Sequence, residues 1–467
     1  MKRRSFFRNT ALAGAGLGVL GACSAPASLV QTSPKKAKNI IFLVSDGMSN
    51  GTLTMADTLK FRREGNTSNW LNLYRENSVN RSLMDMASAS SIVTDSAAAS
   101  SSWGGGHRIP NGGINVGRGG VRHQPLWQKF KRAGKKTGIV TTVPVTHATP
   151  AGFCTNSDSR NDQAGIALNY LEHGPNVILG GGQNYFDSSL RKDGRDLYSE
   201  FEAKAYRVAK NNQELNKINR GDVLGVFDRE GLPYSLDAKN NKDQEKEVPT
   251  LASMTEKAIQ LMKEHPDGFV LQVEGGKVDW AAHANDAGAL LYDQLAFDDA
   301  VEVAMNFALQ NEETLVIITT DHGNANPGML YGKDVNQNFD RIQQFKATND
   351  WILQGITAKD SVEVVRERIE FANGFGIEKV EAKELLDYYT GLEKEEGLYN
   401  YKNLPFKKLS LIQQNYHSVG WASSNHTGDF VELASFGPGS ELIDGFIKNT
   451  DLHYILLEAA EVEQHSS

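Results

Sequence analysis

Cysteine is scarce in this chain: only Cys23 and Cys154 occur among its 467 residues. Cys23 lies in a segment that we expect to be cleaved or lipidated, so Cys154 would be the single thiol left. One thiol cannot form an intramolecular disulfide, and the fold must hold together without one. We expect Cys154 to be a small buried residue rather than a reactive thiol.

The chain also lacks an excess of basic residues. It contains 49 Lys and Arg against 57 Asp and Glu, and its net charge is −8. An acidic surface argues against a nucleic-acid partner, which would require a basic stripe. The sequence shows no internal repeat and no apolar run long enough for a transmembrane span. A hydrophobic fraction of 40% and this length fit one large α/β domain or two to three smaller ones.

Residues 1–22 have the pattern of an export signal. Residues 3–8 (RRSFFR) form a twin-arginine pattern, and the apolar stretch that follows is too short to span a bilayer. Residues 20–23 (LGAC) resemble a bacterial lipoprotein cleavage box with Cys23 as the modified residue. In the alternative interpretation the signal is cut elsewhere and Cys23 is incidental. We expect a protein in the periplasm or lipid-anchored at the cell surface, with a linker over residues 23–38.

Continuous apolar runs recur along the rest of the chain. Such runs are typical of strands buried on both faces of a parallel sheet, and they cover residues 39–44, 137–145, 177–179, 269–273, 314–319 and 430–436. Helical patterns lie between them, for example over residues 280–309. The alternation predicts a doubly wound α/β domain over residues 39–462, with a mostly parallel central sheet flanked by helices. Residues 104–124 are predicted as a glycine-rich loop, and residues 326–420 as a helical insertion between two core strands.

The segment Ile92–Ser100 places a serine where a helix would begin. Its apolar start gives way to Thr-Asp-Ser, and small residues follow. This order would put Ser96 in the first turn of a helix, where main-chain N–H groups favour an anion. Ser96 is therefore a candidate nucleophile that attacks phosphorus. The alternative is a flexible Ser/Ala run in which Asp95 is an ordinary N-cap.

Two segments combine carboxylates with histidines. In the first, Glu274 ends an apolar run, and Asp279 and His283 follow at a spacing of four, which places both on one face of a helix. In the second, Asp321 and His322 directly follow an apolar strand. Oxygen and nitrogen ligands of this kind suit zinc. The alternatives are a surface Asp–His pair in the first segment, and a helix cap with a surface imidazole in the second.

Four further residues add to this pattern. Asp46 follows the first strand and could hold a metal or cap the next helix, and His426 lies in a turn of small residues before the last strand. Thr149 follows the strand that ends at residue 145, and Arg160 could clamp two phosphate oxygens or be an ordinary surface residue. The candidate ligands together exceed one tetrahedral zinc site. They suit two close zinc ions and a harder third ion.

The combined motifs resemble those of the alkaline phosphatase family. The matching residues are Asp46-Gly47-Met48, Thr94-Asp95-Ser96-Ala97-Ala98, Ala148-Thr149-Pro150, Glu274-Gly275-Gly276 with Asp279 and His283, Thr320-Asp321-His322, and His426-Thr427-Gly428. They span nearly the whole mature chain in the order of the family.

The resemblance implies a phosphomonoesterase that forms a phosphoserine intermediate at Ser96, with Arg160 as phosphate clamp and Asp95 as its orienting residue. It implies three sets of metal ligands: Asp279, His283 and His426 for one zinc; Asp46, Asp321 and His322 for a second zinc; and Asp46, Thr149 and Glu274 for magnesium. His147 and Trp280 stand where some members carry Asp and Lys. His147 could thus favour zinc or cobalt over magnesium.

The resemblance also implies small phosphate monoesters as substrates and a homodimer. The insertion is interpreted as a lid or a dimer contact. Two other functions stay open. One is a phosphodiesterase or sulfatase of the same superfamily, and the other is a non-catalytic surface protein that binds metal or phosphate.

Overall fold

The structure is a computed structural model, and it describes residues 36–391 and 403–462. The predicted signal, Cys23 and most of the predicted linker lie outside these residues. None of the helices described is both long and apolar enough to cross a membrane.

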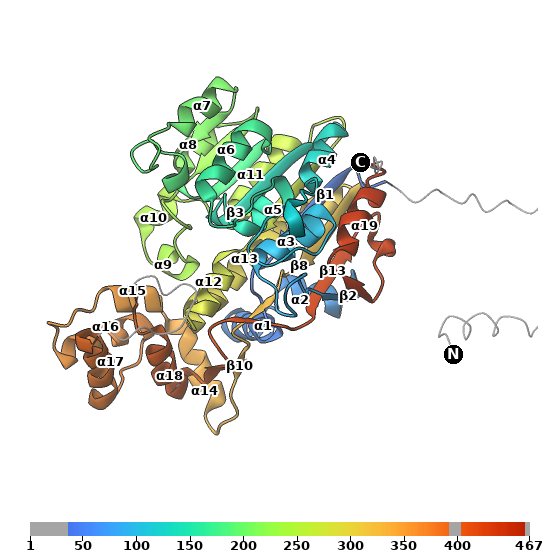
Figure 1. Cartoon of the computed structure of the whole chain (residues 1–467). Helices are drawn as coiled ribbons and strands as arrows, with labels where there is room; N and C mark the ends of the chain where they lie inside the picture. Colours follow the sequence, from blue (N-terminus) through green and yellow to red (C-terminus); the bar gives the residue numbers. More distant parts are fainter. Residues whose placement is uncertain (1–35, 392–402, 463–467) are drawn as a thin grey trace, which may run out of the picture. The chain divides into compact units, whose positions relative to one another are not determined.

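A ten-stranded sheet forms the centre of the fold (Figure 1), in the order β14-β2-β13-β8-β1-β7-β3-β4-β6-β5. Seven neighbouring strands run parallel to one another: β8 (Thr314–Thr319), β1 (Asn39–Val44), β7 (Phe269–Glu274), β3 (Lys136–Pro144), β4 (Val177–Gly181), β6 (Val223–Val226) and β5 (Arg207–Ala209). β13 (Val431–Phe436) is antiparallel to β8 and to β2 (Asn80–Asp85), and β14 (Phe446–Lys448) pairs parallel to β2 at one edge of the sheet. The predicted doubly wound, mostly parallel sheet is confirmed.

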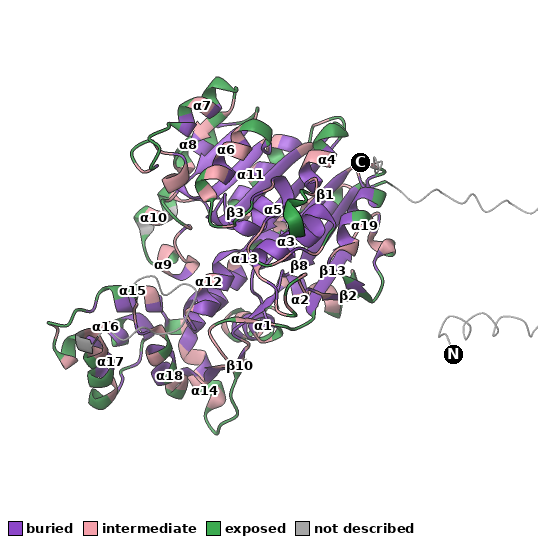
Figure 2. Cartoon of the chain, in the orientation of Figure 1, coloured by how far each residue is buried: buried purple, intermediate pink, exposed green. Residues whose placement is uncertain are grey.

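Strand β1 shows why the apolar runs are continuous. All six of its residues are buried. Ile40 and Phe42 belong to one hydrophobic core, with Trp103, while Ile41 and Leu43 belong to a second core, with Phe297. Since successive side chains of a strand point to opposite faces, each face of the sheet needs its own apolar layer. Figure 2 shows the strands and the helix faces turned toward them as buried.

Helices supply both layers. The first core draws on α3 (Ser96–Gly105), α4 (Leu126–Arg132), α5 (Ala148–Cys154), α6 (Gln163–His173), α7 (Leu197–Ala203) and α19 (Asp451–Ala459). The second core draws on α2 (Asn69–Arg75), α8 (Asn212–Lys217), α11 (Leu251–Met262), α12 (Lys277–His283) and α13 (Ala287–Gln310). Cys154 is 3% exposed within the first core, as expected.

The long helix predicted over residues 280–309 is wrong in one respect, because the chain interrupts it. α12 ends at His283 and α13 begins at Ala287. Asn285 between them has a left-handed φ of 49°, and the Asp286 side chain accepts a hydrogen bond from the main-chain N–H of Ala289 as the N-cap of α13. Asn tolerates the left-handed region and Asp caps helices, so this pair stops one helix and starts the next.

Between β8 and β13 the chain leaves the ten-stranded sheet. It forms two short strand pairs, β9 (Gly323–Asn324) with β12 (His426–Thr427) and β10 (Pro327–Met329) with β11 (Val419–Trp421). Helices lie between them: α14 (Val335–Asp340), α15 (Asn349–Gln354), α16 (Val362–Asn373), α17 (Lys379–Gly391) and α18 (Phe406–His417). They share a third core with α1 (Asn50–Glu64) and α13. The remaining short helices include α9 (Ser235–Lys239) and α10 (Lys242–Glu247).

His417, at the end of α18, predicts acid-sensitive stability. Burial lowers its pKa to about 3, and its Nδ1 accepts a hydrogen bond from the main-chain N–H of Val419 at 3.1 Å. As pH falls below about 6.5, the His417 imidazole becomes protonated in the unfolded chain but stays neutral in the folded chain. The free energy of unfolding therefore falls by up to about 1.4 kcal/mol per pH unit.

We expect His417→Asn, which keeps a hydrogen-bond acceptor, to flatten this decline between pH 6.5 and 5 in urea titrations. The exposed control His173→Asn should leave the slope unchanged, and an unaltered slope in His417→Asn would contradict the assignment.

Candidate active site

The candidate residues meet because parallel strands end at one edge of the sheet. Asp46 follows β1 by two residues, Glu274 is the last residue of β7, and Asp321 follows β8 by two residues. β3, on the far side of β7, leads into α5, which carries Thr149 and has His147 as its N-cap residue. Loops at the carboxyl ends of parallel strands commonly hold the functional groups of α/β proteins.

One group of ligand atoms comes from Asp279, His283 and His426, which lie within 4.8 Å of one another. The Nδ1 atoms of both histidines lie beside main-chain carbonyls, at 2.7 Å from Ser424 O for His283 and 3.0 Å from Thr94 O for His426. A carbonyl can only accept, so each Nδ1 carries a proton, and Nε2 is the ring atom left to bind a metal.

The two Nε2 atoms of this group, on His283 and His426, lie 3.1 Å apart. Two nitrogens bound to one tetrahedral zinc would be about 3.3 Å apart, given bonds of 2.0–2.1 Å. Two lone pairs at this distance repel each other unless a cation lies between them. The predicted helical spacing of Asp279 and His283 is confirmed, because both lie in α12 and their side chains approach to 3.4 Å.

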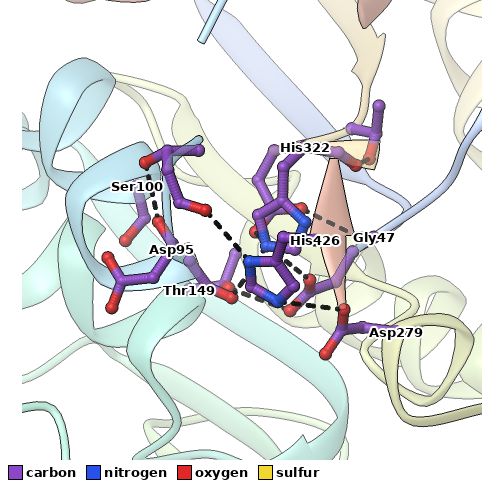
Figure 3. A network of polar contacts seen from close by, with 12 residues as sticks. Gly47, Asp95, Ser100, Thr149, Asp279, His322 and His426 are labelled. Atoms are coloured by element: carbon purple, nitrogen blue, oxygen red, sulfur yellow. Dashed lines mark hydrogen bonds and ion pairs between the residues drawn. The ribbon is translucent and has the colours of Figure 1, made fainter. Parts of the chain in front are cut away.

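A second group comes from Asp46, Asp321 and His322, all fully or almost fully buried. His322 Nε2 lies 3.6 Å from Asp46 Oδ1 and 3.2 Å from Asp321 Oδ2. Its ring stacks on that of His426 at 3.7 Å, which makes the two groups neighbours. Figure 3 shows these two rings together, with His426 linked to Asp279. The interpretations of Asp46 as a helix cap and of His322 as a surface imidazole are wrong, since Ser49 is the N-cap residue of α1 and His322 is 1% exposed.

A third group shares Asp46 with the second and adds His147 and Glu274. His147 Nδ1 lies 3.9 Å from Glu274 Oε1, and the Thr149 hydroxyl donates to Asp46 Oδ2 at 3.2 Å. Thr141, within β3, donates to the other oxygen of Glu274. The sequence did not single out Thr141, because a threonine inside a buried strand carries no distinguishing pattern.

Ser96 is the first residue of α3, and every residue of this helix is buried. The alternative of a flexible Ser/Ala run is therefore wrong. The Ser96 hydroxyl lies 3.1 Å from His322 Nε2, beside the second group. Asp95 is the N-cap residue of α3 and accepts from the main-chain N–H of Ala98 at 2.9 Å, and its other oxygen pairs with Arg160 Nη1 at 3.1 Å. Asp95 thus caps α3 with one carboxylate oxygen and contacts Arg160 with the other.

The carboxylates of the site are buried and close together, which favours the binding of cations. Burial and neighbouring carboxylates raise the pKa of Asp46 well above its usual range. Burial raises the pKa of Glu274 to about 8 and that of Asp321 to about 6. Asp46 Oδ1, Asp321 Oδ2 and Glu274 Oε1 are buried without a hydrogen-bond partner. Buried acids with unsatisfied oxygens fit metal ligands, because a bound cation restores the charged form that burial disfavours.

Burial keeps the neighbouring imidazoles neutral. It lowers the pKa of His147 to about 3, with a contribution from Arg160, and lowers the pKa values of His283 and His322. Neutral imidazoles are the form that binds metal. The donor set therefore fits divalent metal ions, with one group that offers two nitrogens and one carboxylate and two groups that offer two carboxylates and one nitrogen.

Asn324 also belongs to this site, although the sequence did not reveal it. Its Nδ2 donates to Asp279 Oδ1 at 2.7 Å and to the Asp279 carbonyl at 3.2 Å. Gly47 has no space for a side chain here, since a Cβ atom would stand 2.4 Å from Asp279 Oδ1, and its φ of 68° is left-handed. Trp280 lies with its ring 6.4 Å from that of His147. These contacts come from the tertiary arrangement and have no spacing signature.

The comparisons with known proteins agree with this geometry. The family described as Alkaline phosphatase matches residues 37–462. Alkaline phosphatase 4 of Bacillus subtilis is 31% identical over 482 residues, which cover 98% of this chain and 99% of that protein. The crystal structure of Thermus thermophilus alkaline phosphatase superposes with a TM-score of 0.85 at 31% identity, over 96% of each chain. A cold-active alkaline phosphatase from Shewanella gives a TM-score of 0.76 at 26% identity, over 90% of this chain and 99% of that one. The chain belongs to the alkaline phosphatase family, a family of metal-dependent enzymes.

The contact between Asn324 and Asp279 predicts an effect on metal affinity. Removing a hydrogen-bond partner of a metal ligand typically weakens binding 10- to 100-fold. We expect Asn324→Ala to raise the zinc dissociation constant by about that factor in chelator competition. Asn373→Ala removes another buried asparagine, in α16, and should leave it unchanged. Equal affinities in wild type and Asn324→Ala would show that Asn324 does not orient Asp279.

Proposed function

We propose that this protein hydrolyses phosphate monoesters through a phosphoserine intermediate at Ser96. The observation that carries the proposal is the position of the Ser96 hydroxyl, at the start of α3 and 3.1 Å from His322 Nε2. This serine lies beside a group of buried candidate metal ligands. Asp95, the residue before it, contacts Arg160.

Three metal ions fit the donor atoms. Asp279, His283 and His426 would hold one zinc, and Asp46, Asp321 and His322 a second. Asp46 and Glu274, with Thr149 or His147, would hold magnesium, or zinc or cobalt in its place. When bound, the metals would neutralise the charge of the phosphate and stabilise the ionised Ser96 oxygen.

The residues of the chain carry the remaining tasks. Arg160 donates to the phosphate oxygens, and Asp95 orients the guanidinium through its contact with Nη1. Ser96 loses its proton to solvent water and attacks phosphorus in line with the leaving oxygen, which takes up a proton from water as it departs. The bond from phosphorus to Ser96 forms as the bond to the leaving group breaks, and the N–H groups at the start of α3 favour the negative charge. Water then cleaves the phosphoserine, which releases phosphate and restores the hydroxyl.

Ser96→Ala tests the nucleophile. We expect this variant to lose at least about 1000-fold in kcat on p-nitrophenyl phosphate, because its covalent route is closed. It should form no acid-stable phosphoprotein and should still bind zinc. Ser100→Ala, four residues on in the same helix, provides the matched control and should keep its activity. Full turnover by Ser96→Ala would contradict the mechanism.

A phosphodiesterase or sulfatase is the alternative within the superfamily. The free oxygens of a phosphate monoester carry more negative charge than those of a diester or a sulfate ester, so Arg160 and the metals bind them more strongly. Wild-type rates on p-nitrophenyl phosphate above those on bis-p-nitrophenyl phosphate and p-nitrophenyl sulfate would support the monoesterase. A non-catalytic binding protein would show no turnover with zinc and magnesium supplied.

We also propose export by the twin-arginine signal and a lipid anchor on Cys23, on the pattern of residues 3–23. Cells that express wild type should incorporate labelled palmitate into the protein, and Cys23→Ser should abolish this label and release the protein from the membrane fraction. Unchanged membrane association in Cys23→Ser would exclude the anchor. The homodimer and the roles of the predicted insertion stay predictions.

A further inference from the structure

The candidate active site opens into a cleft far larger than a phosphate ion. The cleft has a volume of about 1760 Å³, and its lining includes Arg160, His283 and His426. Pockets for small molecules usually measure about 300–1,000 Å³. Most of this volume is therefore available to the leaving group of the substrate, from which the phosphate is removed.

An aromatic pair lines this cleft away from the metal ligands. Trp351 of α15 and Phe371 of α16 lie with their ring centroids 5.4 Å apart and their planes at 36°. Trp351 is 36% exposed and Phe371 is 55% exposed. Neighbouring aromatic rings that stay open to a cleft offer a flat apolar surface, which a folded chain usually covers.

Two basic side chains complete this surface, which we call the aromatic platform: Trp351, Phe371, Arg368 and Lys346. The Arg368 guanidinium lies 3.6 Å from the centre of the Trp351 ring, and Lys346 Nζ lies 5.5 Å from that of Phe371. Arg368 Nε donates to the carbonyl of Ile352 at 2.8 Å, which fixes its plane over the indole. Stacked rings and a planar guanidinium are the groups that hold nucleobases in proteins.

Charge alone does not define the ligand. The lining holds five basic side chains and five acidic ones. The acids Asp228, Glu230 and Asp237 lie on segments preceding β7, and Asp350 lies on α15. In the platform, Trp351 lies on α15, Arg368 and Phe371 lie on α16, and Lys346 precedes α15. A polyanion would meet both signs, whereas a flat ring gains from the platform whatever its charge.

We propose that the aromatic platform is a leaving-group subsite that favours phosphate substrates bearing a flat aromatic ring, with nucleoside phosphates as the class that fits it. This inference rests on the proposed hydrolysis at Ser96. The phosphate occupies the metal-ligand end of the cleft, and the base stacks on Trp351 and Phe371. Substrates with a small aliphatic leaving group do not reach or gain from the platform.

The test compares kcat/KM for AMP, ADP and ATP with that for glycerol 2-phosphate, measured as phosphate release. The three nucleotides place the base at increasing distances from the terminal phosphate. We expect Phe371→Ala and Trp351→Ala to lower kcat/KM about tenfold for at least one nucleotide, since a stacking contact is worth about that factor. Turnover of glycerol 2-phosphate should stay within twofold of wild type, which also shows that the variants fold.

Phe61→Ala is the matched control, because Phe61 is 56% exposed on α1 and does not line the cleft. It should leave every rate unchanged. Equal rates for all nucleotides in wild type and platform variants would overturn the subsite while leaving the proposed hydrolysis standing, and so would an equal loss on glycerol 2-phosphate. A wild type that hydrolyses neither class of substrate would overturn the proposed function and the subsite together.

Discussion

The burial of four carboxylates at one edge of a parallel sheet is the constraint on which the rest of the site depends. Asp46, Glu274, Asp279 and Asp321 are each at most 1% exposed, and negative charges this close and this dry cannot coexist without cations. The sheet brings these carboxylates together, because β1, β7 and β8 are parallel neighbours and end at the same edge. The histidines supplied by α12, by β12 and by the turn after β8 complete donor sets that divalent metals can satisfy.

Main-chain carbonyl groups fix the orientation of two of the donor imidazoles. Carbonyl groups of Thr94 and Ser424 hold the protonated Nδ1 atoms of His426 and His283, which leaves both Nε2 atoms directed at one point. Thr94 lies two residues before Ser96 in the chain, so the segment that presents the nucleophile also orients a ligand of the first group. Asp95, between them, caps α3 and holds Arg160. The proposed nucleophile Ser96, the proposed phosphate clamp Arg160 and the candidate metal ligand His426 are thus positioned by three consecutive residues, and a displacement of this segment would disturb all three.

Sequence reasoning recovered those parts of the molecule that carry a periodic or local signature. The bounds of β1 and β8 were predicted correctly because a strand buried on both faces is a continuous apolar run. Most candidate ligands could be predicted because they follow such a strand or keep a helical spacing, whereas His426, in a turn before the last strand, was assigned by the family resemblance. The short strands β2, β5, β6 and β14 were missed, since three to six residues at or near a sheet edge leave little pattern. Asn324 and the aromatic platform were missed for another reason: a lone asparagine, or a tryptophan and a phenylalanine 20 residues apart, gain their meaning only from tertiary contacts.

The buried charge of these four carboxylates requires bound metal ions. Anomalous diffraction at the zinc edge from crystals of the zinc-loaded protein tests it most directly. We expect one peak about 2.0–2.2 Å from ligand atoms of Asp279, His283 and His426, and a second at the same distance from Asp46, Asp321 and His322. A metal-free site in a fully active enzyme, with the carboxylates still buried, would contradict it.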